Sequence, residues 1–341
     1  IDWYDNENKK NGGWSLEMID PHNPCTGRDN WIASNGSLGG TPGKTNSVNA
    51  VNSDHTPPQL KSAYAPDNQT VALVFDEPLD SAGAAVTANY NLPGFNIEAA
   101  TPLPPLFQTV QLRLRSPLSV GAIATITVNN VADCKGNVIG AYNKTDIGLP
   151  QPAAANDVVV NEILFNPRTG GSDYVEFFNR SKKIIDASAL SLANRNNSSS
   201  VSSLKRLSTD PFYLFPGAYL VVTTDKPNLQ AQYLVKNTDA VLQLSSLPSF
   251  PDDKGNVILQ TDTGTVIDEV AYNKAWHFGL IDDAEGVALE RIDPDDSSQK
   301  KSNWHSAAST AGFGTPTYRN SQFKAIDNPL AAISLSPAVF S

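Results

Sequence analysis

Residues 287–304 read VALERIDPDDSSQKKSNW, and residues 14–31 read WSLEMIDPHNPCTGRDNW. The two stretches are copies of one another, with seven identical positions at a constant offset of 273 residues (304 − 31). After one inserted residue the copies rejoin, because Gly-Thr-Pro at 40–42 recurs at 314–316 and Asn-Ser at 46–47 recurs at 320–321. The second copy closes a long β-rich segment, whereas little precedes the first. We therefore expect the chain to begin inside a domain of a modular protein.

The composition sets limits on fold and partners. A chain of 341 residues is typical of about two domains, and 40% hydrophobic residues suffice for real cores. Abundant Asn, Ser, Thr, Pro and Gly indicate short strands joined by many turns. The net charge of −10 disfavours nucleic acid and anionic membrane surfaces, and no apolar run is long enough to cross a bilayer. We expect no nucleic-acid partner and no membrane insertion.

The alternating pattern at 70–75, 109–114 and 124–128 predicts strands there. A second β unit follows, with strands expected at 157–165, 174–178, 219–223, 240–243, 257–260, 266–271 and 287–292. Turn-forming residues separate these segments at regular intervals. One short helix is expected within 227–233, and the serine run at 198–203 is expected to be a solvated loop. This pattern predicts β-sandwiches in series.

Several motifs in the second half occur in the order found in one known family. These are Asn161-Glu162-Ile163, Asn166-Pro167, Asp173-Tyr174-Val175-Glu176, LFPGAYLVV at 214–222 and the closing signature within 289–321. Over roughly residues 156–322 they resemble bacterial lamin tail domains. Residues 1–47 match only the last part of such a domain.

Residues 54–148 resemble a bacterial Ig-like domain of surface proteins. The resemblance depends on VFDEPLD at 74–80, Asn89-Tyr90, VNNV at 128–131, Asp133 and Gly136-Asn137. Both families imply an all-β fold of tandem immunoglobulin-like β-sandwiches, in large secreted or cell-surface proteins of Gram-negative bacteria that often leave by the type IX route. Neither family brings a set of catalytic residues, so none is carried over.

The predicted organisation has four parts. Residues 1–47 are the C-terminal part of a first lamin tail domain, and 48–152 form the bacterial Ig-like domain. Residues 153–322 form a complete lamin tail domain, and 323–341 are a linker and the start of a further domain. We expect both ends to be truncations and the strand edges within residues 1–20 to lack partners.

Cys25 and Cys134 are the only cysteines. The second copy of the repeat has Ser298 where the first has Cys25, and only the first copy is followed by an Ig-like unit, which contains Cys134. We predict a disulfide between them, which a loop of roughly 100 residues would make worth on the order of 4–5 kcal/mol at most. The alternative is two unrelated thiols.

Three further groups are considered as sites. Gly39 to Thr45 resembles a phosphate-binding loop, but Leu38 stands where a Gly is needed, so a structural turn is expected. Asp282, Asp283 and Glu285 are candidates for calcium, against ordinary turn chemistry. Glu162, Asp173 and Glu176 lie on adjacent predicted strands, where the two glutamates are expected to face solvent or cap strand edges. No nucleophile, metal triad or His accompanies them, so no catalysis is expected.

The sequence therefore predicts a non-catalytic segment for spacing, adhesion or surface assembly, secreted or on the bacterial cell surface, without a required cofactor. Its partners would be other domains of the same or a neighbouring polypeptide, or a surface protein or glycan. One alternative is an accessory region of a secreted hydrolase, such as a nuclease, whose catalytic domain lies outside this chain. Another is a subunit of a surface or secretion complex.

Overall fold

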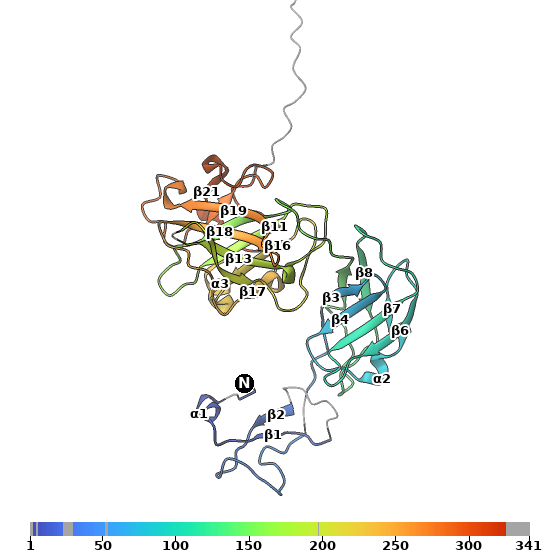
Figure 1. Ribbon diagram of the computed structural model, residues 1–341. Helices are drawn as coiled ribbons and strands as arrows, with labels where there is room; N and C mark the ends of the chain where they lie inside the picture. The colour runs from blue at the N-terminus through green and yellow to red at the C-terminus, as the bar shows by residue number, and fades with distance from the viewer. Residues whose placement is uncertain (1–2, 5, 23–29, 52–53, 197, 325–341) are drawn as a thin grey trace, which may run out of the picture. The chain divides into compact units, whose positions relative to one another are not determined.

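The computed structural model describes residues 3–4, 6–22, 30–51, 54–196 and 198–324, and the fold is all-β (Figure 1). The chain divides into two compact units, residues 1–149 and residues 150–341. Its α-helices are short: α1 (Glu7–Lys10), α2 (Ser81–Ala84) and α3 (Lys226–Gln232). In the part of the chain that is described, no helix has the length and apolar character needed to span a membrane.

The first unit contains one strand pair and two larger sheets. Strands β1 (Leu16–Met18) and β2 (Trp31–Ala33) pair antiparallel. A four-stranded sheet has the order β3 (Leu60–Asp67), β4 (Thr70–Phe75), β7 (Thr109–Leu114), β6 (Ile97–Pro102). A three-stranded sheet has the order β5 (Tyr90–Asn91), β8 (Ala124–Val128), β9 (Lys144–Ile147). Alternate residues of β7 and β8 are fully buried, as are the successive residues Val71 to Leu73 of β4, as expected for a sandwich core.

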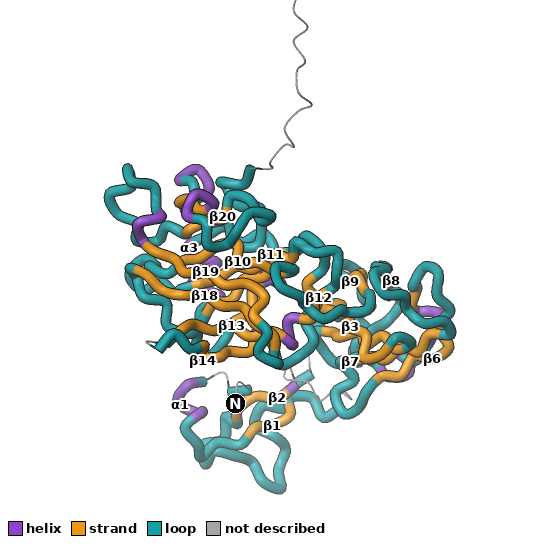
Figure 2. Tube along the Cα trace, turned by 45° about the horizontal axis from the view of Figure 1, so that its top comes forward, coloured by secondary structure: helices purple, strands orange, loops and turns teal. Residues whose placement is uncertain are grey.

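The second unit is a sandwich of a six-stranded and a four-stranded sheet, visible as orange segments in Figure 2. The larger sheet has the order β17 (Val241–Gln243), β16 (Tyr219–Thr223), β11 (Tyr174–Asn179), β10 (Val158–Leu164), β20 (Leu289–Arg291), β21 (Trp304–Ser306). The smaller has the order β14 (Val201–Arg206), β13 (Leu190–Arg195), β18 (Lys254–Thr261), β19 (Val266–Asn273). A separate pair joins β12 (Ile185–Asp186) to β15 (Tyr213–Leu214).

A bulge in β10 sets which side chains reach the core. The register of β10 against β11 shifts between Val160 and Glu162. Val160 lies in the core before the shift and Ile163 after it, so the extra residue exchanges the two faces of the strand. Glu162 and Leu164 consequently lie on the face of the six-stranded sheet that points away from the sandwich core.

That outer face is covered by protein. Leu164, Tyr174 and Val221 from the sheet pack with Leu229 of α3 and with Tyr233 in a second buried cluster. Asp225 caps α3 by accepting a hydrogen bond from the backbone N–H of Asn228, and a Pro near its first turn suits a helix start. The six-stranded sheet is therefore buried on both faces.

Four of the predicted strands have the bounds that the structure shows. The bounds 70–75, 109–114, 124–128 and 219–223 coincide with β4, β7, β8 and β16, and the predicted helix is α3. The serine run was expected to be a loop, and this is wrong for its second half. Val201 to Ser203 begin β14, which pairs antiparallel with β13, because backbone pairing to a neighbouring strand outweighs the low strand propensity of serine.

Candidate functional site

Three carboxylates are completely buried side by side in the six-stranded sheet. Glu162 on β10 lies opposite Glu176 on β11 and opposite Glu290 on β20, and all three are 0% exposed. The expectation that Glu162 and Glu176 face solvent or cap strand edges is wrong. They point to the outer face of the sheet, but α3 and the segment 313–322 cover that face.

Glu162 and Glu290 share a hydrogen-bonding partner, the Thr315 hydroxyl. Its Oε1 accepts from the Tyr174 hydroxyl at 2.6 Å and from the Thr315 N–H at 2.9 Å. The Thr315 hydroxyl oxygen lies 3.1 Å from Glu162 Oε2 and 2.8 Å from Glu290 Oε1. A hydroxyl has only one hydrogen, so a proton on Glu162 donating to Thr315, which donates to Glu290, satisfies both contacts.

Burial and charge repulsion both favour the protonated form of Glu162. Burial, followed by repulsion from Glu290, raises the pKa of Glu162 from 4.5 to about 8. Burial and the nearby Glu162 likewise raise the pKa of Glu176 well above its ordinary value. Glu176 accepts from the Asn161 amide and the Thr317 N–H. The donors from 315–317 thus bind the closing part of the unit to its first two strands.

Glu290 and Asn320 complete the same connection. Glu290 Oε2 accepts from the Ser321 hydroxyl at 2.7 Å and the Gln322 N–H at 2.8 Å. The Asn320 amide donates to the carbonyls of Asn161 and Arg291 and accepts from the Asn161 side chain. One side-chain amide therefore bridges β10 and β20 at the bulge.

A buried ion pair links this region to the other sheet. The Arg291 guanidinium lies 3.0 Å from the Asp268 carboxylate, and their side chains are 0% and 3% exposed. Asp268, on β19, also accepts from the Ser298 hydroxyl and from the Val160 N–H. Ser298 occupies the position of Cys25 in the repeat.

The two copies of the repeat share a set of five equivalent hydrogen bonds. We call residues 14–22 and 30–50 the first closing module and residues 287–324 the second. In the first module the bonds are Thr41 Oγ1 and Ser47 Oγ to Glu17, Asn46 Nδ2 to Met18 O, Asp20 N to Asn30 Oδ1, and Asn30 Nδ2 to Asp20 O. The equivalent bonds in the second are Thr315 Oγ1 and Ser321 Oγ to Glu290, Asn320 Nδ2 to Arg291 O, Asp293 N to Asn303 Oδ1, and Asn303 Nδ2 to Asp293 O.

Glu17 is buried, at 4% exposure, and ionised. Burial by itself raises its pKa, but hydrogen bonds from Ser47, Thr41 and Ser34 outweigh that effect and lower the pKa to about 2. In the first module this carboxylate has no second carboxylate opposite it among the described strands, since β1 pairs there with β2 alone.

The calcium candidates from the sequence lie in an exposed turn. Asp283 accepts from the Glu285 N–H at 2.9 Å, and Glu285 accepts from the Thr169 N–H and hydroxyl. The Asp283 contact is ordinary turn chemistry, and the Glu285 contacts join the turn to Thr169, 116 residues earlier in the chain. Asp282, Asp283 and Glu285 do not form a group of three close ligand atoms in the described chain, and calcium there stays a prediction.

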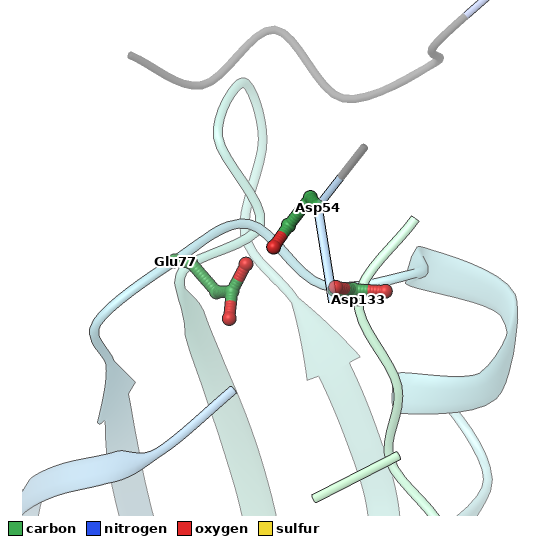
Figure 3. Close-up of side chains that lie close together, drawn as sticks. All are labelled: Asp54, Glu77 and Asp133. Atoms are coloured by element: carbon green, nitrogen blue, oxygen red, sulfur yellow. The ribbon is translucent and has the colours of Figure 1, made fainter. Parts of the chain in front are cut away.

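A different group, which the sequence did not single out, could hold a cation. Figure 3 shows Asp54, Glu77 and Asp133 approaching one another from separate segments, with ligand oxygens within 4.8 Å. Asp133 already accepts from the backbone N–H groups of Lys135 and Asn137 and from the Asn137 amide. Glu77 and Asp133 lie in the stretches that resemble an Ig-like domain, but no sequence spacing connects them.

The predicted disulfide cannot be followed in full, because Cys25 lies outside the described residues. Cys134 is partly buried, with its Sγ 3.6 Å from the Leu79 carbonyl. The Cys25–Cys134 pair therefore stays a prediction. The expected strand start within residues 323–341 lies mostly outside the described residues as well.

Comparison with known proteins finds one family model that matches part of the chain. Residues 151–274 match the Lamin Tail Domain family model, a range that stops before the second closing module. No curated protein matches the chain.

Three solved structures illustrate the structural likenesses. The N-terminal part of the bacterial S-layer protein SbsC has 14% identity and a TM-score of 0.26, covering 64% of this chain and 44% of its own. A DUF4876 family protein from Bacteroides thetaiotaomicron has 10% identity and a TM-score of 0.29, covering 65% and 85%. The Yersinia pseudotuberculosis adhesin InvE has 14% identity and a TM-score of 0.20, covering 68% and 67%. This chain thus spans less than half of the SbsC chain, and likenesses this weak carry no weight for the function.

Proposed function

We propose, from the lamin tail match over residues 151–274, that this chain is a non-catalytic structural and interaction segment of a multi-domain bacterial extracellular protein. Its role would be spacing, adhesion or assembly at the cell surface, with β-sandwiches in series supplying length. The observation that supports this most directly is the use of Glu162, Glu176 and Glu290 as a buried connection between the closing module and the first strands.

The chemistry of these carboxylates favours a structural role over catalysis. A general acid or base must reach within hydrogen-bonding distance of its substrate, whereas all three side chains are 0% exposed. Their oxygens accept from Tyr174, Thr315, Thr317, Asn161 and Ser321. The bonds from the Thr315 and Thr317 N–H groups join the second closing module to Glu162 and Glu176, which lie 153 and 141 residues earlier in the chain.

Two measurements test the proposal. The purified chain is assayed for hydrolysis of nucleic acid, peptide and glycoside substrates with Mg²⁺ or Ca²⁺, beside a Glu162→Gln/Glu176→Gln variant. We expect no turnover from either protein, and turnover that the double variant abolishes would refute a non-catalytic role. Antibody labelling of intact cells that carry the gene is expected to detect the protein, and labelling only after lysis would refute a surface location.

A result from the longer protein would identify the competing function. Hydrolysis by the parent polypeptide that this chain alone does not show would make the chain an accessory region of a secreted hydrolase.

A further inference from the structure

Strand β1 has one free edge within the described part of the chain. The Ser34 N–H donates to Ser15 O and the Ile19 N–H donates to Asn30 O. Alternate residues of an antiparallel strand direct their backbone groups to opposite sides. Ser15, Glu17 and Ile19 therefore face β2, and the backbone groups of Leu16 and Met18 face away from it.

The equivalent edge is occupied in the second unit. There β20 pairs with β10 on that side, with Glu162 opposite Glu290 and Ile163 opposite Leu289. The difference also appears in burial. Leu289 and Trp304 are 0% and 3% exposed, whereas Leu16 and Trp31, their equivalents in the first module, are only partly buried.

The side chains that hold β10 in the second unit have counterparts beside the free edge. The Asn320 side chain bridges β20 to Asn161, and the backbone N–H of Thr315 donates to Glu162 while its hydroxyl oxygen lies between Glu162 and Glu290. Asn46 and Thr41 occupy the equivalent positions in the first module. The Asn46 side chain donates to the Met18 carbonyl at 3.0 Å, and the Thr41 hydroxyl donates to Glu17 at 2.5 Å. Both side chains are therefore already oriented in the absence of a strand paired with the free edge of β1.

We propose that the free edge of β1, with Thr41 and Asn46, binds an extended segment from outside residues 1–341 that carries Asn-Glu followed by an apolar residue. The segment runs antiparallel to β1, as Asn161-Glu162-Ile163 runs against β20. Its Asn forms hydrogen bonds with the Asn46 amide, its Glu accepts from the Thr41 backbone N–H as Glu162 does from that of Thr315, and its apolar residue pairs with Leu16. This inference depends on the proposed interaction function and names the partner chemistry.

The structure argues against a second copy of this chain as the source of the segment. Every residue of β10 is buried, and the strand lies between β11 and β20 inside a six-stranded sheet. Releasing it would expose the apolar side chains of Val158, Val160 and Ile163 to water, all of which are now 0% exposed, and so would destabilise the sandwich. A segment that is free of its own sandwich avoids this cost.

The test uses the full chain and a fluorescent peptide with the sequence of residues 157–165, DVVVNEILF, extended by lysines for solubility. Fluorescence anisotropy is expected to show saturable binding, at least tenfold weaker for the matched peptide in which the Asn and Glu are Ala. Hydrogen exchange is expected to slow at Leu16 to Met18 when the peptide is bound. In the chain, Asn46→Ala is expected to weaken binding and Asn49→Ala, on the same loop, to leave it unchanged.

Three results would overturn the proposal: equal binding of both peptides, protection of another segment, or no binding at millimolar peptide. A dimer that protects Leu16 to Met18 without peptide would also overturn it, by making a second copy the occupant. Because the peptide change leaves the chain intact, unfolding of the Asn46→Ala variant does not prevent a decision. The hydrolysis and labelling tests are independent, so failure here leaves the proposed function standing.

Discussion

Replacing Glu162 by Gln removes a buried carboxyl group whose proton the fold retains. With an ordinary pKa of 4.5 and a folded pKa of about 8, the folded state holds more protons than the unfolded state between these values. The contribution of Glu162 is therefore complete below pH 4.5 and is lost as the pH rises through about 8.

The pH dependence of the free energy of unfolding follows from the one additional proton that Glu162 binds in the folded state. The free energy of unfolding is expected to fall by on the order of 1 kcal/mol per pH unit, or a few kcal/mol from pH 5 to pH 8. Gln fits the site of the protonated acid, because its carbonyl can accept from Tyr174 and its amide can donate to Thr315. We expect Glu162→Gln to flatten the pH profile and to be more stable than the wild type at pH 8.

Urea unfolding followed by tryptophan fluorescence measures this effect. In a background with Trp3, Trp14 and Trp31 changed to Phe, the remaining tryptophans are Trp276 and Trp304 in the second unit. Their rings lie 6.2 Å apart, and Trp304 is 3% exposed, so unfolding should shift their emission.

The matched control is Glu285→Gln, because Glu285 is an exposed glutamate of the same unit. The control should follow the wild type at every pH. Parallel profiles for the wild type and Glu162→Gln would refute the buried proton. So would an equal loss of stability at all pH values, since it would mean that the charged form is required.

Three other outcomes are expected. Asp268→Asn should lower the free energy of unfolding by about 3–5 kcal/mol, because it leaves the Arg291 charge buried without its partner. The control Asp262→Asn changes an exposed side chain and should cost almost nothing. Equal urea midpoints for the two variants would contradict this. The NMR signal of the Glu17 side-chain carboxyl carbon should titrate with a midpoint near pH 2. The stability that its hydrogen bonds contribute is therefore present above pH 4.5 and lost on acidification. A midpoint near 4.5 would show that these bonds are not made. Alkylation of the unreduced protein should label neither Cys25 nor Cys134 and should label both after reduction, and two labels without reductant would exclude the disulfide.

The sequence predicts the strands well wherever local alternation is strong. Segments such as Thr109–Leu114 and Ala124–Val128 alternate and are followed by turn residues, so their bounds follow from the chain itself. The repeat also predicts which residues make equivalent contacts, since Glu17 and Glu290 accept from equivalent Thr and Ser hydroxyls.

The burial of Glu162 and Glu176 could not be predicted from the sequence around each residue. Their exposure depends on α3 and on residues 313–322, which arrive from far along the chain, and on a bulge at Asn161 that exchanges the faces of β10. The approach of Asp54, Glu77 and Asp133 is equally non-local. Only the motif Asn161-Glu162-Ile163 drew attention to the region, and it gave no indication of a shared proton.

The Glu17 carboxylate also affects how the free edge of β1 behaves in a crowded solution. An open strand edge is a template for indiscriminate stacking into fibrils. Two β1 edges meeting across a two-fold axis would bring two Glu17 charges together, which is unfavourable without protons to neutralise them. The ionised Glu17 side chain thus disfavours self-association of the unpaired β1 edge at neutral pH. Acidification, which protonates Glu17, is expected to weaken this effect.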